Sequence, residues 1–407
     1  MNIDQLLDRV DEAGSLAFLT KMVQHKSYPD SDGERALAEF MVEQMRSLGL
    51  EANLSPVTES RVNAIGTWKG KGGGKSLLFN GHLDTNPASE GWTVDPWVGK
   101  VDEKFKFIYG IGVSNMKAGD AAYFCAVKTL IDCGVRLRGD VILTYVIGEL
   151  QGGIGTVAAI KQGVRADYFI NSEPTDLSAV TMHAASLSYT VELTGVTRHL
   201  SKREEAVDAI SAACALIPRI NAMTFPNAKS EEHRSINRGH VGIVHGALGK
   251  DLHEWRPPQV SDFVRLRGVC RYAQGQTEED ALEGVRSLLR TLEEEFPGLR
   301  ASVMAEKNTG RPTMPPFEVP KNSRIVSVVN EAYRKVRGQP QPTGAILPAG
   351  FFGTDAGHLQ ELAGMEGIVC GPGGRYNTMP DERVDVADYL DMIRIYMLAI
   401  LEICGVD

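Results

Sequence analysis

Short apolar segments that alternate with helical patterns constrain the fold of this chain more than any other feature. Three such segments, each bounded by turn residues, cover 76–80, 141–147 and 168–171, and a helical pattern covers 118–133. Strands that alternate with helices form βαβ units, in which helices cover both faces of the sheet. The sequence therefore predicts an α/β domain with a central mixed, mostly parallel sheet flanked by helices.

The pattern changes after Pro174. Strand-like and helical segments then follow in the β-α-β-β-α-β order of a small ferredoxin-like module. Three strands of this order are assigned at 186–193, 263–272 and 300–305, and its two helices at 204–217 and 278–296. A proline-rich linker, 311–320, leads back to helical and short-strand patterns. We expect a catalytic domain made of 1–183 and 309–407, interrupted by an α+β lid and dimerisation domain at 184–308.

The net charge and the cysteine content of the chain disfavour some classes of partner and indicate where in the cell the protein is located. Forty-three basic and 52 acidic residues give a net charge of −9, which disfavours nucleic acid as a partner. The longest apolar runs, such as 141–147, are far too short to cross a bilayer. The charged segment 1–10 does not have the pattern of a signal peptide. Six scattered cysteines without a CxxC pair argue against a disulfide framework and a cysteine zinc site. We expect a cytoplasmic protein that binds neither membranes nor nucleic acids.

Polar side chains follow the predicted strands, at the edge where α/β folds place their sites. His82 and Asp84 come after the first strand, Glu149 after the second and Glu173 after the third. Asp84 can orient the imidazole for metal binding, although such a pair also occurs in capped turns. A carboxylate that ends a buried strand tends to have a raised pKa, which suits Glu149 to act as a general base.

Three glycine-rich segments carry further candidate residues. They are 110–119 with Asn115, 353–358 with Thr354, Asp355 and His358, and 371–374 with Gly373. Asn115 is either a pocket residue or a helix cap. His358 either lines the pocket, where it could replace a lost group, or lies near solvent at the start of a helix.

In this order and spacing, the motifs resemble the di-zinc metallopeptidase family of aminoacylases, acetylornithine deacetylases, succinyl-diaminopimelate desuccinylases and glutamate carboxypeptidases. The resemblance covers nearly the whole chain, including the inserted module. It implies a catalytic α/β domain with two zinc ions and a lid domain that usually dimerises. It also implies hydrolysis of the amide of N-acyl amino acids or of C-terminal amino acids.

The resemblance implies a role for each matching residue of the catalytic domain. His82 falls on a ligand of the first zinc, Asp84 on its orienting aspartate, and Glu173 on a carboxylate ligand of the same ion. Glu149 falls on the general base.

Further matches concern the substrate. In the lid, His199 falls on a histidine that reaches a neighbouring subunit's site, and Arg271 on the arginine that binds a substrate carboxylate. The glycine-rich turns that contain Thr354, Asp355 and Gly373 fall near the substrate.

Three residues depart from the family's pattern, and all three concern the metal ions. Asn115 stands where the family has an aspartate that bridges both ions, Leu150 where it has a glutamate ligand, and Thr378 where it has a histidine ligand. Leucine has no lone pair, and neutral amide or hydroxyl oxygens bind zinc poorly. We therefore expect no two-zinc centre, and either no metal or one weakly held divalent cation on His82 and Glu173.

Retention of the base and of the carboxylate-binding arginine favours a hydrolase-like enzyme that acts on an amide or related C–N bond of a small substrate with a carboxylate. Glu149 is the expected base, and His82 or His199 the acid or oxyanion stabiliser. Two alternatives remain open: metal-free acid–base chemistry without hydrolysis, such as isomerisation, elimination or amide transfer, and a homologue that binds its ligand without catalysis. We also expect a homodimer that forms through the lid.

Overall fold

The structure is a computed structural model that describes residues 2–102, 104, 106–306 and 310–407. The chain divides into two compact units. Unit 1 consists of Met1–Met182, Phe317–Ala349 and Thr354–Asp407, and unit 2 of His183–Pro316 and Gly350–Gly353. Unit 2 begins one residue before the predicted boundary at 184, and the predicted boundary at 308–309 lies outside the described residues.

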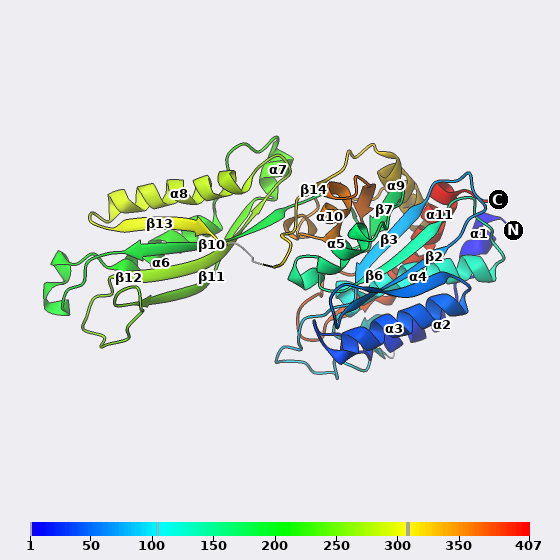
Figure 1. Cartoon of the computed structure of the whole chain (residues 1–407), viewed down its shortest axis with the longest axis horizontal. Helices are drawn as coiled ribbons and strands as arrows, with labels where there is room; N and C mark the ends of the chain where they lie inside the picture. Colours follow the sequence, from blue (N-terminus) through cyan, green and yellow to red (C-terminus); the bar gives the residue numbers. More distant parts are fainter. Residues whose placement is uncertain (1, 103, 105, 307–309) are drawn as a thin grey trace. The chain divides into compact units, whose positions relative to one another are not determined.

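An eight-stranded mixed sheet forms the centre of unit 1 (Figure 1). In spatial order its strands are β1 (Glu51–Pro56), β2 (Val62–Trp68), β6 (Val141–Val146), β3 (Leu77–His82), β7 (Tyr168–Asn171), β16 (Glu366–Val369), β8 (Ala179–Val180) and β15 (Thr343–Gly344). β3 pairs in parallel with both β6 and β7, and β7 also pairs in parallel with β16. The antiparallel strands β1 and β2 form one edge. The predicted mixed, mostly parallel sheet is confirmed.

Helices lie on both sides of this sheet (Figure 1). The helices of unit 1 are α1 (Ile3–Leu7), α2 (Glu12–Val23), α3 (Asp32–Ser47), α4 (Ala118–Asp132), α5 (Ile154–Lys161), α9 (Arg324–Arg337), α10 (Asp355–Glu361) and α11 (Val386–Cys404). On α3 the buried residues Leu37, Met41 and Met45 recur every fourth position, so one stripe faces the sheet. Helix α11 is apolar and buried around most of its circumference, because it packs against α4, α9 and β3 at once.

Shorter elements complete unit 1. Strands β4 (Lys100–Val101), β5 (Phe107–Tyr109) and β17 (Arg383–Asp385) form a three-stranded sheet, and β9 (Met182–His183) pairs with β14 (Phe317–Glu318). A π-helical turn, η1, covers Val113–Lys117, and short 3₁₀ turns are η2 (Glu149–Gln151) and η4 (Ala349–Phe351).

Unit 2 has one antiparallel sheet with two helices. Along the chain its main elements are β10 (Ala185–Thr194), the 3₁₀ turn η3 (Leu200–Glu205), α6 (Ala209–Asn221), α7 (Glu231–Ser235), β11 (Arg238–Ala247), β12 (Phe263–Tyr272), α8 (Glu278–Glu295) and β13 (Arg300–Ala305). The spatial order is β11-β12-β10-β13, which is that of a ferredoxin-like module. Alternate residues of β10 are buried, so one face of the sheet carries the core with α6 and α8.

Two elements of unit 2 differ from the prediction. Helix α6 begins at Ala209 rather than at 204, because the side chain of Asp208 accepts hydrogen bonds from the backbone N–H groups of Ile210 and Ser211 and caps the helix there. Strand β11 did not appear as a strand segment in the sequence. Most of its residues are exposed, and glycines interrupt the alternation, so it lacks the apolar pattern of a half-buried strand.

A search of the described residues finds no helix with the length and apolar character that a bilayer crossing needs.

Candidate active site

Three neighbouring strands of the central sheet end at one cluster of ionisable side chains. His82 is the last residue of β3, Glu149 follows β6 in η2, and Glu173 follows β7. Because β6, β3 and β7 are parallel neighbours, their carboxyl ends meet at one edge of the sheet. His82 Nε2 lies 3.9 Å from Glu149 Oε2 and 3.7 Å from Glu173 Oε1. The structure thus brings together the three residues that the sequence places at strand ends.

The His82 imidazole is a buried cation among carboxylates. Its side chain is 1% exposed. Burial acts to lower the pKa of His82, but the negative charges of Glu173, Asp84 and Glu149 outweigh burial and raise the pKa to about 10. The imidazole therefore keeps its proton at neutral pH unless a metal ion takes the place of that proton.

Glu149 and Glu173 are carboxyl groups that ionise with difficulty. Burial, and next to it the charge of Glu173, raises the pKa of Glu149 well above the ordinary glutamate value. Burial also raises the pKa of Glu173. A carboxyl group whose pKa is moved towards neutrality is suited to take a proton from water and later to return it.

Asp84 positions this cluster in two ways. His82 Nδ1 lies 2.8 Å from the main-chain carbonyl oxygen of Asp84, which accepts its hydrogen bond, and 3.6 Å from the carboxylate. The Asp84 carboxylate instead accepts hydrogen bonds from the backbone N–H groups of Glu149, at 3.3 Å, and Leu150, at 3.1 Å. One residue therefore fixes both the imidazole and the turn that carries Glu149.

Asn115 lies in the cluster, within η1, and not at the end of a helix. Its side-chain oxygen lies 3.1 Å from His82 Nε2. The backbone N–H groups of Ser114 and Asn115 donate to the Glu382 carboxylate at 2.9 and 3.0 Å. Asn115 has φ −122° and ψ 95°, which are not helical, so the alternative of a helix cap does not describe it.

Asp355 and His358, both on α10, pack against the turn that follows Glu149. A Cβ atom added to Gly153, which has φ +77°, would lie 2.5 Å from Asp355 Oδ1 and 2.7 Å from His358 Cδ2, so only glycine fits there. His358 Nε2 lies 2.9 Å from the Gly152 carbonyl oxygen. The alternative of a solvent-exposed His358 is wrong, because the residue is 3% exposed and burial lowers its pKa. Burial raises the pKa of Asp355 to about 7.

Three ionisable residues of this region were not among the predicted site residues. Lys117 is 0% exposed, and burial lowers its pKa to about 7, while its Nζ donates to the His25 carbonyl oxygen. Burial raises the pKa of Glu382 to about 7 and that of Asp120 well above its usual value. Lys117 lies two residues after Asn115, and Glu382 lies four residues after Thr378. This closeness to candidate residues in the sequence is the signal that could have identified them.

One group of side chains among the described residues could hold a metal ion. His82, Glu149 and Glu173 each offer one ligand atom, and these atoms lie within 4.8 Å of one another. In the described part of the chain no other such group of three is found. Leu150 is 38% exposed and has no donor atom, and Thr378 is exposed with φ +55°. Neither supplies the ligand of a second ion.

The other predicted site residues lie as follows. Thr354 is buried, and its side chain caps α10 by accepting from Ala356 N–H. A Cβ atom on Gly373 would lie 2.5 Å from Ser114 Oγ, so this glycine allows its turn to approach the segment of Asn115. His199 and Arg271 belong to unit 2. The His199 ring hydrogen-bonds to Ser201 near η3, and Arg271 lies on β12.

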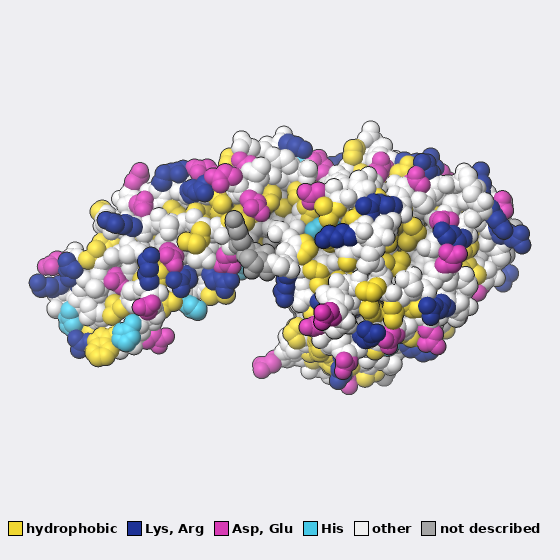
Figure 2. Space-filling view, viewed as in Figure 1, with side chains coloured by type: hydrophobic (Ala, Val, Ile, Leu, Met, Phe, Trp, Pro, Cys, Tyr) yellow, Lys and Arg dark blue, Asp and Glu magenta, His cyan; other side chains and the backbone are white. Residues whose placement is uncertain are grey.

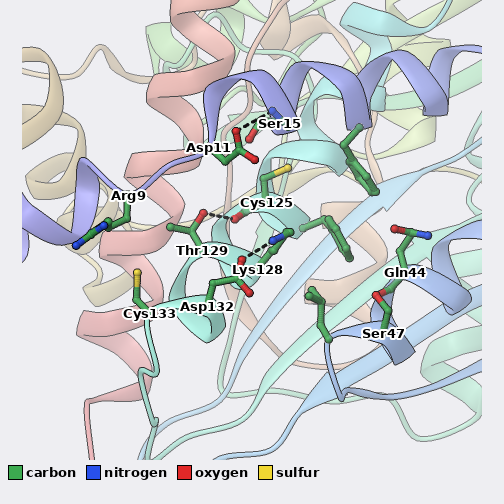
Figure 3. Close-up of a pocket in the computed structure, with 14 residues that line it drawn as sticks. Arg9, Asp11, Ser15, Gln44, Ser47, Cys125, Lys128, Thr129, Asp132 and Cys133 are labelled. Atoms are coloured by element: carbon green, nitrogen blue, oxygen red, sulfur yellow. Dashed lines mark hydrogen bonds and ion pairs between the residues drawn. The ribbon is translucent and has the colours of Figure 1, made fainter.

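A separate pocket of about 540 Å³ in unit 1 lies among α2, α3 and α4 (Figure 3). Its polar groups are largely satisfied by one another. Lys128 forms an ion pair with Asp132, and the Thr129 hydroxyl donates to the Cys125 carbonyl oxygen (Figure 3). None of its lining residues belongs to the cluster around His82. We assign the candidate site to that cluster.

Comparisons with known proteins identify the family of this chain. The model of Peptidase family M20/M25/M40 matches residues 78–402. An N-formyl-4-amino-5-aminomethyl-2-methylpyrimidine deformylase of Bacillus subtilis is 23% identical over 395 residues, which cover 93% of this chain and 91% of the relative. An acetylornithine deacetylase of Proteus mirabilis is 27% identical over 378 residues, which cover 90% of this chain and 89% of the relative.

Solved structures have the same fold. A tripeptidase from Staphylococcus aureus superposes with a TM-score of 0.76 at 20% identity and covers 97% of this chain and 99% of its own. A dinuclear metal binding peptidase of the M20 family from Bacillus subtilis superposes with a TM-score of 0.65 at 14% identity. This match covers 96% of this chain and 99% of the peptidase. With the family model matched over most of its length, the chain belongs to Peptidase family M20/M25/M40.

Proposed function

We propose that this protein hydrolyses an amide or related C–N bond in a small substrate that carries a carboxylate, such as an N-acyl amino acid or a peptide. The observation that carries the proposal is the buried Glu149 carboxyl group, whose pKa is raised, beside the His82 imidazole at the ends of parallel strands. Family membership supports the reaction class. The activities for which three similar proteins are named, those of a deacetylase, a deformylase and a tripeptidase, fit it as well.

In this proposal Glu149 removes a proton from the attacking water and later returns it to the leaving nitrogen. His82 is held by the Asp84 carbonyl and presents Nε2 to the cluster, where an N–H group can stabilise negative charge on a carbonyl oxygen. Arg271 binds the substrate carboxylate, and His199 contributes a second acidic N–H group. The low exposure of His82 and Glu149 strengthens their interactions, because little water competes with them.

We further propose that the centre holds at most one divalent cation. His82 and Glu173 would be the residues that hold it, and Glu149, the third member of the group, would act as the base beside it. The same carboxylates that raise the pKa of His82 would favour a cation there. Such an ion supplies Lewis-acid polarisation of a carbonyl and lowers the pKa of bound water. The side chains of Leu150 and Thr378 support the absence of a second ion.

The test is turnover of a panel of N-acetyl, N-formyl and dipeptide substrates, with and without added Zn²⁺. We expect turnover of at least one of them, and the Glu149→Gln variant should lower kcat by about 10²–10⁴-fold while the substrate still binds. The matched control is Glu402→Gln, because Glu402 is a 66% exposed glutamate on α11. Equal turnover by wild type and Glu149→Gln would refute the assigned base. Binding without turnover would favour a non-catalytic homologue.

We also propose a homodimer that forms through unit 2. Strand β11 is the edge strand, ten residues long, with Ile243 and Val244 44% and 47% exposed. On the adjacent α6, Ile210 is 45% exposed. Hydrophobic and histidine side chains also gather at the end of unit 2 where the β11–β12 loop lies (Figure 2). A long edge strand with apolar side chains is suited to pair with a second copy of itself.

A cytoplasmic location remains part of the proposal. All six cysteines are free, as a reducing compartment requires. Fluorescence microscopy or fractionation of cells that express the tagged protein tests it.

A further inference from the structure

The backbone of the turn η1 is held in place by two other segments of the chain. The N–H groups of Ser114 and Asn115 donate to Oε1 of Glu382 at 2.9 and 3.0 Å. In addition, the N–H group of Gly374 donates to the Ser114 hydroxyl oxygen at 2.9 Å. Glu382 is 4% exposed, so little water competes for its carboxylate. The main chain at Asn115 is therefore fixed before any ligand binds, because all these partners belong to the protein itself.

The Asn115 side chain uses one of its two polar atoms within the protein. Its Oδ1 lies 3.1 Å from His82 Nε2. An amide oxygen only accepts hydrogen bonds, so Nε2 is the donor in this contact. The other polar atom, Nδ2, has no acceptor within hydrogen-bond distance among residues 2–102, 104, 106–306 and 310–407. The other four residues of η1 are buried, whereas Asn115 is partly exposed, so Nδ2 can reach a ligand.

The groups around His82 Nε2 make a hydrogen-bond donor valuable at this position. The carboxylates of Glu149 and Glu173 lie 3.9 and 3.7 Å from this nitrogen. A carboxylate repels the negative charge that develops on a carbonyl oxygen when water attacks an amide. Preorganised N–H groups stabilise that charge. A site that contains these carboxylates therefore needs N–H donors at the carbonyl oxygen, and the amide nitrogen of Asn115 carries two N–H bonds.

We propose that Asn115 is a catalytic residue whose Nδ2–H group donates a hydrogen bond to the substrate carbonyl oxygen as that oxygen becomes negative. The inference rests on the proposed function and adds a second donor beside His82. When water attacks the carbonyl carbon, the π electron pair of the C=O bond moves to the oxygen, and Glu149 takes a proton from the water. When the C=O bond forms again, the C–N bond breaks and Glu149 returns the proton to the nitrogen. Asn115 exchanges no proton in either step.

Glu382 is the positioning residue in this scheme, because it acts through the backbone N–H group of Asn115. An oxyanion donor is effective when its position is fixed in advance, since no reorganisation is then needed during the reaction. Both hydrogen bonds from η1 end on Oε1 of Glu382. A glutamine retains an oxygen in that place, whereas an alanine removes it. We therefore expect Glu382→Ala to lower kcat and Glu382→Gln to retain most of it.

Isothermal titration calorimetry of the full-length protein, with EDTA present, tests the donor with two probes. The first is N-acetylalanine, whose amide carbonyl is planar. The second is its phosphinate analogue, in which a tetrahedral P(O)O⁻ group replaces the carbonyl and CH₂ replaces the amide nitrogen. We expect wild type to bind the phosphinate about 10²-fold more tightly. Asn115→Ala should weaken phosphinate binding by about 10²-fold and the binding of N-acetylalanine by no more than about threefold.

Asn115→Asp separates the proposed donor from a purely structural role. An aspartate has the shape of asparagine and keeps an oxygen for His82 and a backbone N–H group for Glu382, but its side chain has no N–H group. It should weaken phosphinate binding at least as much as Asn115→Ala does. Asn53→Ala and Asn53→Asp are the matched controls, because Asn53 is an exposed asparagine on β1. Both controls should leave the two Kd values unchanged.

Four results overturn the proposal. Asn115→Asp that binds the phosphinate as tightly as wild type shows that Asn115 only orients His82. Asn115→Ala that weakens both probes equally shows a general loss of the binding site. An Asn53 variant that loses the preference shows that the effect is not specific to Asn115. The fourth result is a wild-type protein that binds neither probe or does not prefer the phosphinate.

Kinetics on a substrate from the panel separate this inference from the proposed function. Asn115→Ala should lower kcat by about 10²–10³-fold and leave KM within about threefold, because the donor acts mainly in the transition state. Turnover that Glu149→Gln abolishes and Asn115→Ala leaves intact keeps the hydrolase proposal and refutes the donor. A preference for the phosphinate that depends on Asn115, in a protein that turns over no panel substrate, supports the donor and refutes the hydrolase proposal.

Discussion

The side-chain oxygen of Asn115 lies 3.1 Å from Nε2 of His82, in the middle of a cluster of buried carboxyl groups. An amide oxygen at this point carries no charge, so it adds neither attraction for a cation nor repulsion towards Glu149 and Glu173. This contact is the basis for our proposal that the cluster holds at most one ion, because a neutral amide oxygen is a poor ligand for a divalent cation.

Restoring the missing donors should restore the second ion. We expect the triple variant Asn115→Asp, Leu150→Glu, Thr378→His to retain two Zn²⁺ per chain after dialysis, and wild type at most one, as measured by inductively coupled plasma mass spectrometry. Asn115→Asp alone should tighten binding of the single ion by about 10–100-fold, the usual size of effects at such sites. A wild-type protein that already holds two tightly bound zinc ions would contradict the assignment of Leu150 and Thr378.

The contributions of Glu382 and His82 to the stability of the metal-free protein should fall as pH rises. The pKa of Glu382 is raised to about 7 in the folded state, so folding costs more as this group ionises between about pH 4.5 and 7. The pKa of His82 is raised to about 10, so its contribution is complete below about pH 6.5 and is lost as pH rises to about 10. Both groups therefore act in the same direction.

Urea unfolding in the presence of a chelator at pH 5, 7 and 9 measures this effect. Glu382→Gln should flatten the decrease between pH 5 and 7, and His82→Gln the decrease between pH 7 and 9. A pH dependence that is the same in wild type and in both variants would show that neither buried group has the assigned shift.

Replacing Asp84 should change the titration of His82. The negative charge of Asp84 contributes to the raised pKa of His82, so Asp84→Asn should lower that pKa, measured by NMR of the imidazole ring. Turnover should also fall, because the Asp84 carboxylate holds the backbone N–H groups of Glu149 and Leu150. Asp95→Asn, in an exposed loop, is the control and should leave the His82 titration unchanged.

The buried ion pair between Arg61 and Glu34 should be important for stability. Its atoms lie 2.6 Å apart, and the two side chains are 7% and 2% exposed. Glu34→Ala leaves Arg61 buried without its partner and should lower the free energy of unfolding by about 3–5 kcal/mol. Asp132→Ala, which breaks an exposed pair with Lys128, should cost less than about 1 kcal/mol. Because Arg61 also hydrogen-bonds to Gln151, Glu34→Ala should reduce turnover as well.

The proposed dimer gives a further prediction. Val244→Glu places a charge on the exposed edge strand and should convert a dimer into monomers, as measured by light scattering after size-exclusion chromatography. Lys250→Glu, in the loop after β11, is a control for added negative charge and should leave the dimer intact. A wild-type protein that is monomeric at high concentration would refute the proposal.

The sequence by itself determined the α/β class, the inserted module and the three strand-end residues His82, Glu149 and Glu173. These follow from local patterns: an apolar run predicts a strand, and the polar residue after it lies at the carboxyl end of that strand. The resemblance to the family, and not a local pattern, identified Asn115, Leu150 and Thr378 as departures from the family's metal-ligand positions.

Only the tertiary structure decided which groups share the buried space. Lys117, Asp120 and Glu382 join the cluster through contacts between segments far apart in the chain, and His358 is buried because α10 packs against the turn at Gly153. Likewise, Arg238 and Arg271 are 33 residues apart and meet only because β11 pairs with β12 in a fixed register. Burial and strand pairing set the pKa values and the neighbouring charges, and both depend on long-range packing that no local pattern encodes.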